Sequence, residues 1–166
     1  MSDKADVSKL FELAIAAERT NEELFFGLAA KFAHYQPVAD FWVEYAQDEA
    51  IHAQSLEQIR DALSPEQLSA PADPYQLENA YKALRLQVKD ALTGIDDLEE
   101  AYQLAHEMEH AETNAVFEFL IGNFSADQQT QSFLRSQLGE HIAKLIDGFP
   151  APFKRTARRR EIRALE

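Results

Sequence analysis

The sequence contains no cysteine, and this absence excludes disulfides, thiolate metal sites, iron–sulfur clusters and cysteine nucleophiles. Five glycines and six prolines are few, and they lie mostly between segments with helical periodicity. No stretch approaches the roughly 18 consecutive apolar residues of a spanning helix, and the polar N-terminus lacks the pattern of a secretory signal. We therefore expect a soluble cytoplasmic protein with no membrane partner.

Basic residues are also scarce, since 16 Lys and Arg stand against 29 Asp and Glu and give a formal net charge of −13. Such a charge disfavours nucleic acid as a partner of the body of the protein and favours cations. Six of the 16 basic residues lie in the C-terminal tail, KRTARRREIRALE (154–166). We expect this tail to rest on the acidic body of its own chain or a neighbouring subunit, or to dock an acidic partner.

The hydrophobic pattern predicts an all-α protein, and a length of 166 residues fits one domain. Long helices are expected at about 6–33, 37–63, 95–122 and 126–148. A loop-like stretch at 64–74 and a further helical segment at 75–92 would then join the second and third long helices by a long crossover. This is one of the known connectivities of four-helix bundles. We expect the bundle to occupy residues 1–153 and the tail to follow it.

Several acidic residues interrupt the apolar faces of these helices. Residues spaced alternately by three and four positions share one face. By this rule Glu18 lies on the apolar face of the first helix. Glu49 and His52 lie on that of the second helix. Glu109 and Glu112 interrupt the apolar stripe of the third.

The fourth helix leaves two candidates open. Its apolar stripe of leucines passes through His141 and leaves Glu140 at the flank. A faint internal repeat favours the other residue, because Glu109 and Glu140 have the same separation as Glu18 and Glu49. We therefore keep both Glu140 and His141 as candidates.

Buried carboxylates without compensation cost several kcal/mol each. No Lys or Arg lies on these stripes, so the glutamates are either protonated or neutralised by cations. Carboxylate oxygens with one or two imidazoles suit iron or manganese, with zinc as a substitute. The number of ligands implies two metal ions. The candidate metal ligands are Glu18, Glu49, His52, Glu109, Glu112, Glu140 and His141.

Glu18, Glu49-x-x-His52, Glu109-x-x-Glu112 and the Glu/His pair on the fourth helix resemble the ferritin-like di-iron domain of rubrerythrins across residues 6–149. The second carboxylate of Glu109-x-x-Glu112 makes the chain look more like a rubrerythrin than a minimal ferritin. The resemblance implies a ferritin-like four-helix bundle with two iron ions, for which manganese or zinc can substitute. It implies ferroxidase or peroxide reductase activity toward O₂ or peroxide. Glu49 and Glu112 would bridge the ions, and the other candidates would be terminal ligands. We also expect a homodimer or a higher homo-oligomer.

The sequence departs from this family in two ways. Rubrerythrins carry a rubredoxin-like domain with four iron-binding cysteines, so here we expect electrons from a separate donor protein. The fourth helix has Leu138-x-x-His141 where the family has Glu-x-x-His. Two other functions remain open: a non-catalytic bundle that binds metal or a partner, and a di-iron hydroxylase of an organic substrate. An apolar pocket beside the metals would favour the hydroxylase. Tyr45 and Tyr102 are either core residues or groups that orient a ligand carboxylate.

Overall fold

The computed structural model describes residues 5–85, 87–109 and 112–147, and within these ranges it is helical with no β-strand. The expected all-α class is confirmed. The tail at 154–166 and the domain boundary before it lie outside the described residues. None of the described helices combines the length and the apolar composition that a membrane crossing requires.

The helices follow one another as α1 (Val7–Lys31), α2 (Gln36–Asp61), α3 (Pro65–Ser69), α4 (Pro74–Ala83), α5 (Val88–Thr93), α6 (Leu98–Glu109), α7 (Glu112–Phe124) and α8 (Gln128–Asp147). The first, second and last of the expected long helices agree with α1, α2 and α8 to within two residues at each end. The third, expected at 95–122, corresponds to α6 and α7.

Side-chain caps explain where the long helices begin. The Asp6 carboxylate accepts a hydrogen bond from the Lys9 backbone N–H at 2.9 Å and starts α1. Asp127 does the same for α8, with the Thr130 N–H 2.7 Å from its Oδ1. These caps satisfy amide groups that have no partner inside the helix.

The connection between α2 and α6 is more helical than its composition suggested. The expected loop at 64–74 contains α3, which begins with a reciprocal capping box between Ser64 and Gln67 and a proline at its first turn. The helical segment expected at 75–92 is two helices, α4 and α5. The expected loop is therefore partly helical, because a cap can start a helix that is too short to show periodicity, whereas the segment expected to be helical does contain helices.

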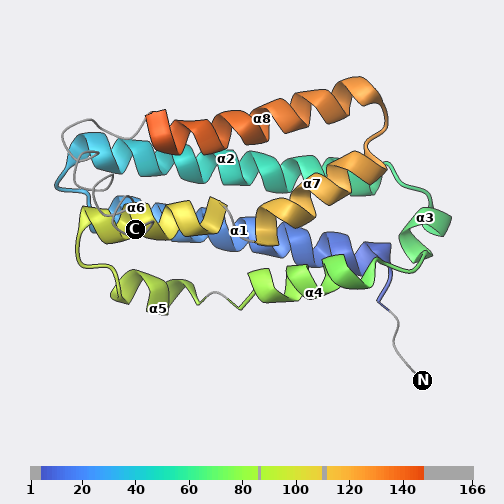
Figure 1. Ribbon diagram of the computed structural model, residues 1–166, viewed down its shortest axis with the longest axis horizontal. Coiled ribbons are helices and arrows are strands. Elements are labelled where there is room, and N and C mark those ends of the chain that lie inside the picture. The colour runs from blue at the N-terminus through green and yellow to red at the C-terminus, as the bar shows by residue number, and fades with distance from the viewer. Residues whose placement is uncertain (1–4, 86, 110–111, 148–166) are drawn as a thin grey trace, which may run out of the picture.

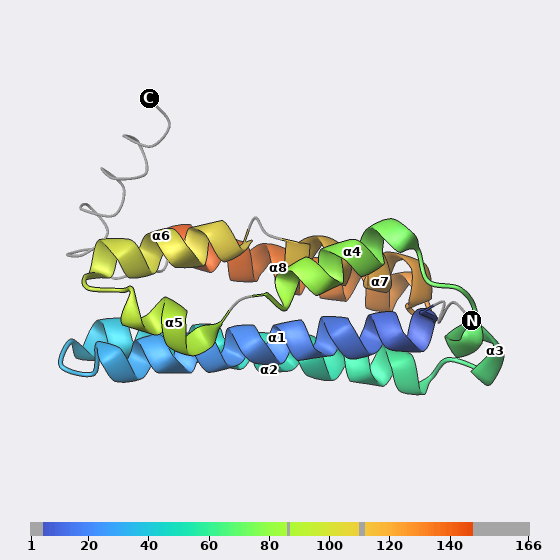
Figure 2. The same ribbon diagram turned by 90° about the horizontal axis from the view of Figure 1, so that it is seen from below.

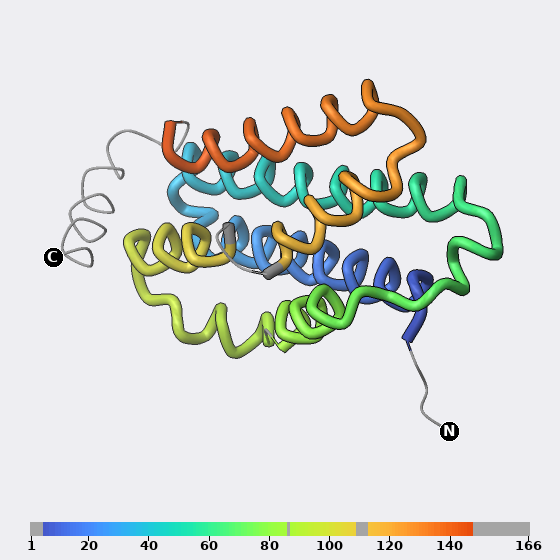
Figure 3. Tube along the Cα trace, turned by 45° about the vertical axis from the view of Figure 1, so that its right-hand side comes forward, coloured from blue at the N-terminus to red at the C-terminus, as the bar shows by residue number. Residues whose placement is uncertain are grey.

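Figure 1 shows α1, α2 and α8 running along the long axis, with α6 and α7 following one another beside them. α1 and α2 form an antiparallel hairpin, which has the most extensive packing of any helix pair among the described residues. The connection after α2 returns along the side away from α8. Within it, α4 packs against both α1 and α7, and α5 packs against α1. Figure 2 shows the α1–α2 pair in one layer and α4, α6, α7 and α8 in the other. Figure 3 shows that this connection brings the chain back to the end where α1 ends.

The buried apolar side chains form two clusters along the long helices. The first cluster draws on the ranges 7–15, 53–59, 116–121 and 134–138. The second draws on the ranges 25–32, 38–46 and 101–105 and on Leu145. Between the two clusters, α1 carries Glu18, α2 carries Glu49 and His52, and α8 carries His141. Polar residues from three helices therefore lie at the junction of two apolar cores.

Candidate metal centre

Four of the predicted site residues are almost completely buried. Glu18, Glu49 and His141 are each 1% exposed and His52 is 2% exposed. Their helices carry apolar side chains on both sides of these positions, so the same packing that buries the core buries the polar groups. The apolar stripes predicted this burial correctly.

Glu18, Glu49 and His52 form a compact group. His52 Nδ1 lies 3.7 Å from Glu18 Oε2 and 3.6 Å from Glu49 Oε2. These distances are too long for hydrogen bonds. One oxygen of each carboxylate and one nitrogen of His52 all lie within 4.8 Å of one another. Because metal bonds to nitrogen and oxygen are about 2 Å long, atoms bound to one ion lie up to about 4 Å apart, so this group fits one cation with only small side-chain shifts.

The polar atoms of this group lack the partners that buried atoms usually have. Both oxygens of Glu18, the Oε2 of Glu49 and the Nδ1 of His52 have no hydrogen-bond partner among the described residues. Within the same residues, no Lys or Arg forms an ion pair with either glutamate. Buried polar groups are nearly always hydrogen-bonded, and a cluster of unpartnered ones calls for an explanation. Carboxylate oxygens with an imidazole nitrogen are a donor set that binds iron, manganese or zinc.

His141 of α8 contacts the other side of Glu49. Its Nε2 lies 2.6 Å from Glu49 Oε1, whereas Glu49 Oε2 faces His52. Its Nδ1 lies 2.9 Å from Asp48 Oδ2, and its ring stacks on Tyr45 with the centroids 3.9 Å apart. A contact from one ring nitrogen to a carboxylate fixes the orientation of an imidazole and leaves the other nitrogen for a ligand. The two oxygens of Glu49 therefore face two different histidines.

The pKa values of Glu18 and Glu49 are shifted in opposite directions. Burial raises the pKa of Glu18 well above its usual value, and the neighbouring Glu49 raises it further. Burial would also raise the pKa of Glu49, but Glu18, His141 and His52 outweigh burial and lower that pKa below its usual value. In the metal-free chain Glu18 therefore holds a proton more firmly, and Glu49 carries the negative charge.

The pKa values of His52 and Asp48 are also shifted by their charged neighbours. Burial lowers the pKa of His52, but Glu18 and Glu49 outweigh burial and raise it to about 9. Burial raises the pKa of Asp48, but His141 and Lys144 outweigh it and hold that pKa below its usual value. Lys144 Nζ donates to Asp48 Oδ2 at 2.8 Å. Without a metal, these shifts favour the protonated forms of Glu18 and His52 beside the charged Glu49.

The other predicted ligands are not brought into this group by the described structure. Glu140 is exposed on α8, one residue from His141. Glu109 is the last residue of α6 and Glu112 the first of α7, and their side chains lie outside the described part of the structure. Tyr102 is 1% exposed in the second apolar cluster.

Asp48 was missed by the sequence reasoning. It lies off the apolar stripe of α2, and its partner His141 is 93 positions away in the chain. Its position directly before Glu49 was the only available signal. That signal is weak, because the contact depends on how α2 and α8 pack.

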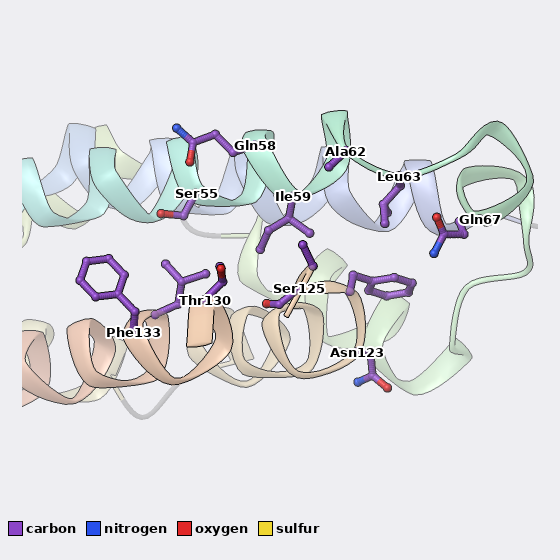
Figure 4. Close-up of a pocket in the computed structure, with 13 residues that line it drawn as sticks. Ser55, Gln58, Ile59, Ala62, Leu63, Gln67, Asn123, Ser125, Thr130 and Phe133 are labelled. Carbon is purple, nitrogen blue, oxygen red and sulfur yellow. The ribbon is translucent and has the colours of Figure 1, made fainter. Parts of the chain in front are cut away.

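Two cavities differ in their relation to this group. A cavity of about 100 Å³ between α2 and α8 is lined by His52 and His141 together with Asp48, Ile51, Gln137, Glu140 and Lys144. A larger cavity of about 480 Å³ lies between the end of α2 and the α7–α8 turn, where Ser55, Ile59, Thr130 and Phe133 are among its lining residues (Figure 4). Its lining contains none of the predicted ligands. The larger cavity is therefore separate from the candidate metal centre.

Comparisons of the chain with protein-family models, with curated proteins and with solved structures find no significant match.

Proposed function

We propose that this chain is a ferritin-like di-iron protein of the rubrerythrin type that reacts with O₂ or peroxide. The observation that carries the proposal is the buried group of Glu18, Glu49 and His52, whose four unpartnered polar atoms lie at the junction of two apolar cores. In this proposal α1, α2, the α6–α7 segment and α8 are the four helices of the bundle. The connection from α2 to α6 is its long crossover.

Each oxygen of Glu49 would serve a different ion. Glu18, Glu49 Oε2 and His52 Nδ1 would hold the first, and Glu49 Oε1 with His141 Nε2 would contribute to the second. We expect Glu109 and Glu112 to complete the ligand set, because their positions in the sequence fall between the two clusters on α6 and α7. The carboxylate-rich donor set favours iron, with manganese or zinc as substitutes.

When bound, two Fe(II) ions supply the two electrons that reduce an O–O bond. The residues of the chain prepare the site for this chemistry. Asp48 and the ring of Tyr45 hold His141 in one orientation, so that its Nε2 faces Glu49. The apolar clusters on both sides keep bulk water away from the carboxylates, which strengthens the electrostatic interactions inside the site.

The reaction partners follow from the same features. O₂ and peroxide are small enough for a centre beside a cavity of about 100 Å³. The 166 residues contain no cysteine with which to bind a rubredoxin-type iron, so repeated turnover would need electrons from a donor outside these residues. The large uncharged cavity shares no residue with the centre, and we therefore do not propose an organic hydroxylase.

Anaerobic loading with Fe(II) followed by limiting peroxide tests this function. Reduction of one peroxide to two waters consumes two electrons and two protons, so each peroxide should oxidise two Fe(II) to Fe(III). We expect ferric absorbance to appear faster than with free Fe(II) and to stop at that ratio. The Glu49→Ala variant should react no faster than free Fe(II), because it loses the ligand shared by both ions. If the wild-type protein binds iron but oxidises it no faster than free Fe(II), the protein is a structural or storage metal protein instead.

A further inference from the structure

We infer that the small cavity between α2 and α8 is the route by which cations reach the buried centre, with Glu140 at its mouth and the Lys144–Asp48 ion pair as its gate. This inference rests on the proposed metal function. It assigns a role to three residues that need not bind the resident ions themselves.

Access is a physical requirement of this centre. Its ligands are only 1–2% exposed, so a cation cannot bind them without passing between helices. The cavity of about 100 Å³ has room for several water molecules, and both His52 and His141 are among its lining residues. His52 Nδ1 has no hydrogen-bond partner among the described residues and lies within 4 Å of Glu18 and Glu49. His52 therefore both lines the cavity and lies next to the two carboxylates.

Two carboxylates along this path attract a cation. Glu140 is exposed and belongs to the lining, so it adds negative charge where the cavity meets solvent. Asp48 follows, with its side chain 23% exposed. An arriving cation would thus meet one carboxylate at the surface and another beside His141.

Lys144 occupies the position that controls this path. Its Nζ lies 2.8 Å from Asp48 Oδ2, the same oxygen that contacts His141 Nδ1. The ammonium group neutralises Asp48 and repels an incoming cation. Because the Lys144 side chain is 33% exposed, solvent screens the ion pair, and it can open by side-chain motion. The gate therefore slows entry without contributing to the final ligand set.

The rate of Co²⁺ uptake by the metal-free protein tests this inference, with equilibrium affinity measured separately by calorimetry. Lys144→Met keeps an aliphatic side chain but removes the charge, and we expect uptake to become about threefold or more faster at low salt. Glu140→Gln should slow uptake by a similar factor. Both variants should keep the wild-type affinity to within about twofold, whereas His141→Ala should lower it.

Matched controls lie on α4, away from this cavity. Lys82 and Glu78 form an exposed ion pair, so Lys82→Met and Glu78→Gln make the same charge changes and should leave uptake unchanged. Wild-type uptake rates in both Lys144→Met and Glu140→Gln, with Co²⁺ still bound, would overturn the entrance while leaving the proposed metal centre intact. A changed affinity with an unchanged rate would overturn it too. Failure of the wild-type protein to bind Co²⁺ or Fe(II) would instead overturn the proposed function.

Discussion

His52 links the charge of the buried group to the stability of the metal-free protein. Its Nδ1 lies between two carboxylates that are almost without solvent contact, and their combined effect raises its pKa to about 9 from an ordinary value of 6.5. A raised pKa means that the folded state holds the proton more tightly than the unfolded state does. Glu18 acts in the same direction, since its pKa is also raised.

We therefore predict that the metal-free protein becomes less stable as the pH rises. The contribution of His52 is fully present below about pH 6.5 and is lost as the pH rises through about 9. A shift of this size corresponds to at most about 3 kcal/mol. The free energy of unfolding, measured by urea denaturation with a chelator present, should fall across this pH range.

Two histidine variants separate this effect from other titrations. His52→Gln should flatten the pH dependence, whereas His34→Gln, at an exposed position, should keep it. An equally steep fall in wild type and His52→Gln would show that the buried histidine does not hold the proton.

At the same scale, the sequence anticipated which side chains are buried better than it anticipated their contacts. The stripe through His141 was a better guide to burial than the repeat that favoured Glu140, because the packing of α8 itself decides which of its faces is inside. Asp48 was not predictable, since its contact joins two helices that are distant in the chain. For the same reason the division of the Glu49 oxygens between two histidines became visible only in three dimensions.

At the scale of elements, the long helices were predictable and the short ones were not. α1, α2 and α8 each have several turns of regular apolar spacing, and that periodicity predicted their limits to within two residues. α3 has five residues and depends on a capping box. Propensity and periodicity contain too little information over so short a stretch.

Two helical glycines provide a test of how the elements pack. A Cβ at Gly139 of α8 would meet nothing within 4 Å, so Gly139→Ala should stabilise the protein by about 0.5–1 kcal/mol through the helix preference of alanine. A Cβ at Gly27 of α1 would overlap Leu92 Cδ1 of α5. The Leu92 side chain must shift to make room, and the cost of that shift offsets the helix preference of alanine, so Gly27→Ala should stabilise the protein less than Gly139→Ala does.

Urea denaturation of the two alanine variants checks this prediction. Combining Gly27→Ala with Leu92→Ala removes the overlap and should reduce the cost of the Gly27 substitution. An equal gain in stability at both glycines would contradict the packing of α5 on α1.

At the scale of the whole molecule, the two apolar clusters enclose the polar layer that lies between them. The clusters supply the hydrophobic free energy of folding, and the layer between them places carboxylates where they are costly without a cation. A bound metal would convert that cost into stability, because ligands held in the folded state bind it more tightly than those in an unfolded chain do. The excess of negative charge, −13 over the chain, also favours cation binding.

The number of metal ions held per chain tests the central claim most directly. Metal-free protein should be titrated anaerobically with Fe(II), freed of unbound iron and analysed for iron and protein, with helical content followed by circular dichroism. The proposed centre predicts about two Fe per chain, and Glu49→Ala should hold at most about one. Stable binding of one ion or none by wild-type protein that is fully folded would contradict the dinuclear centre.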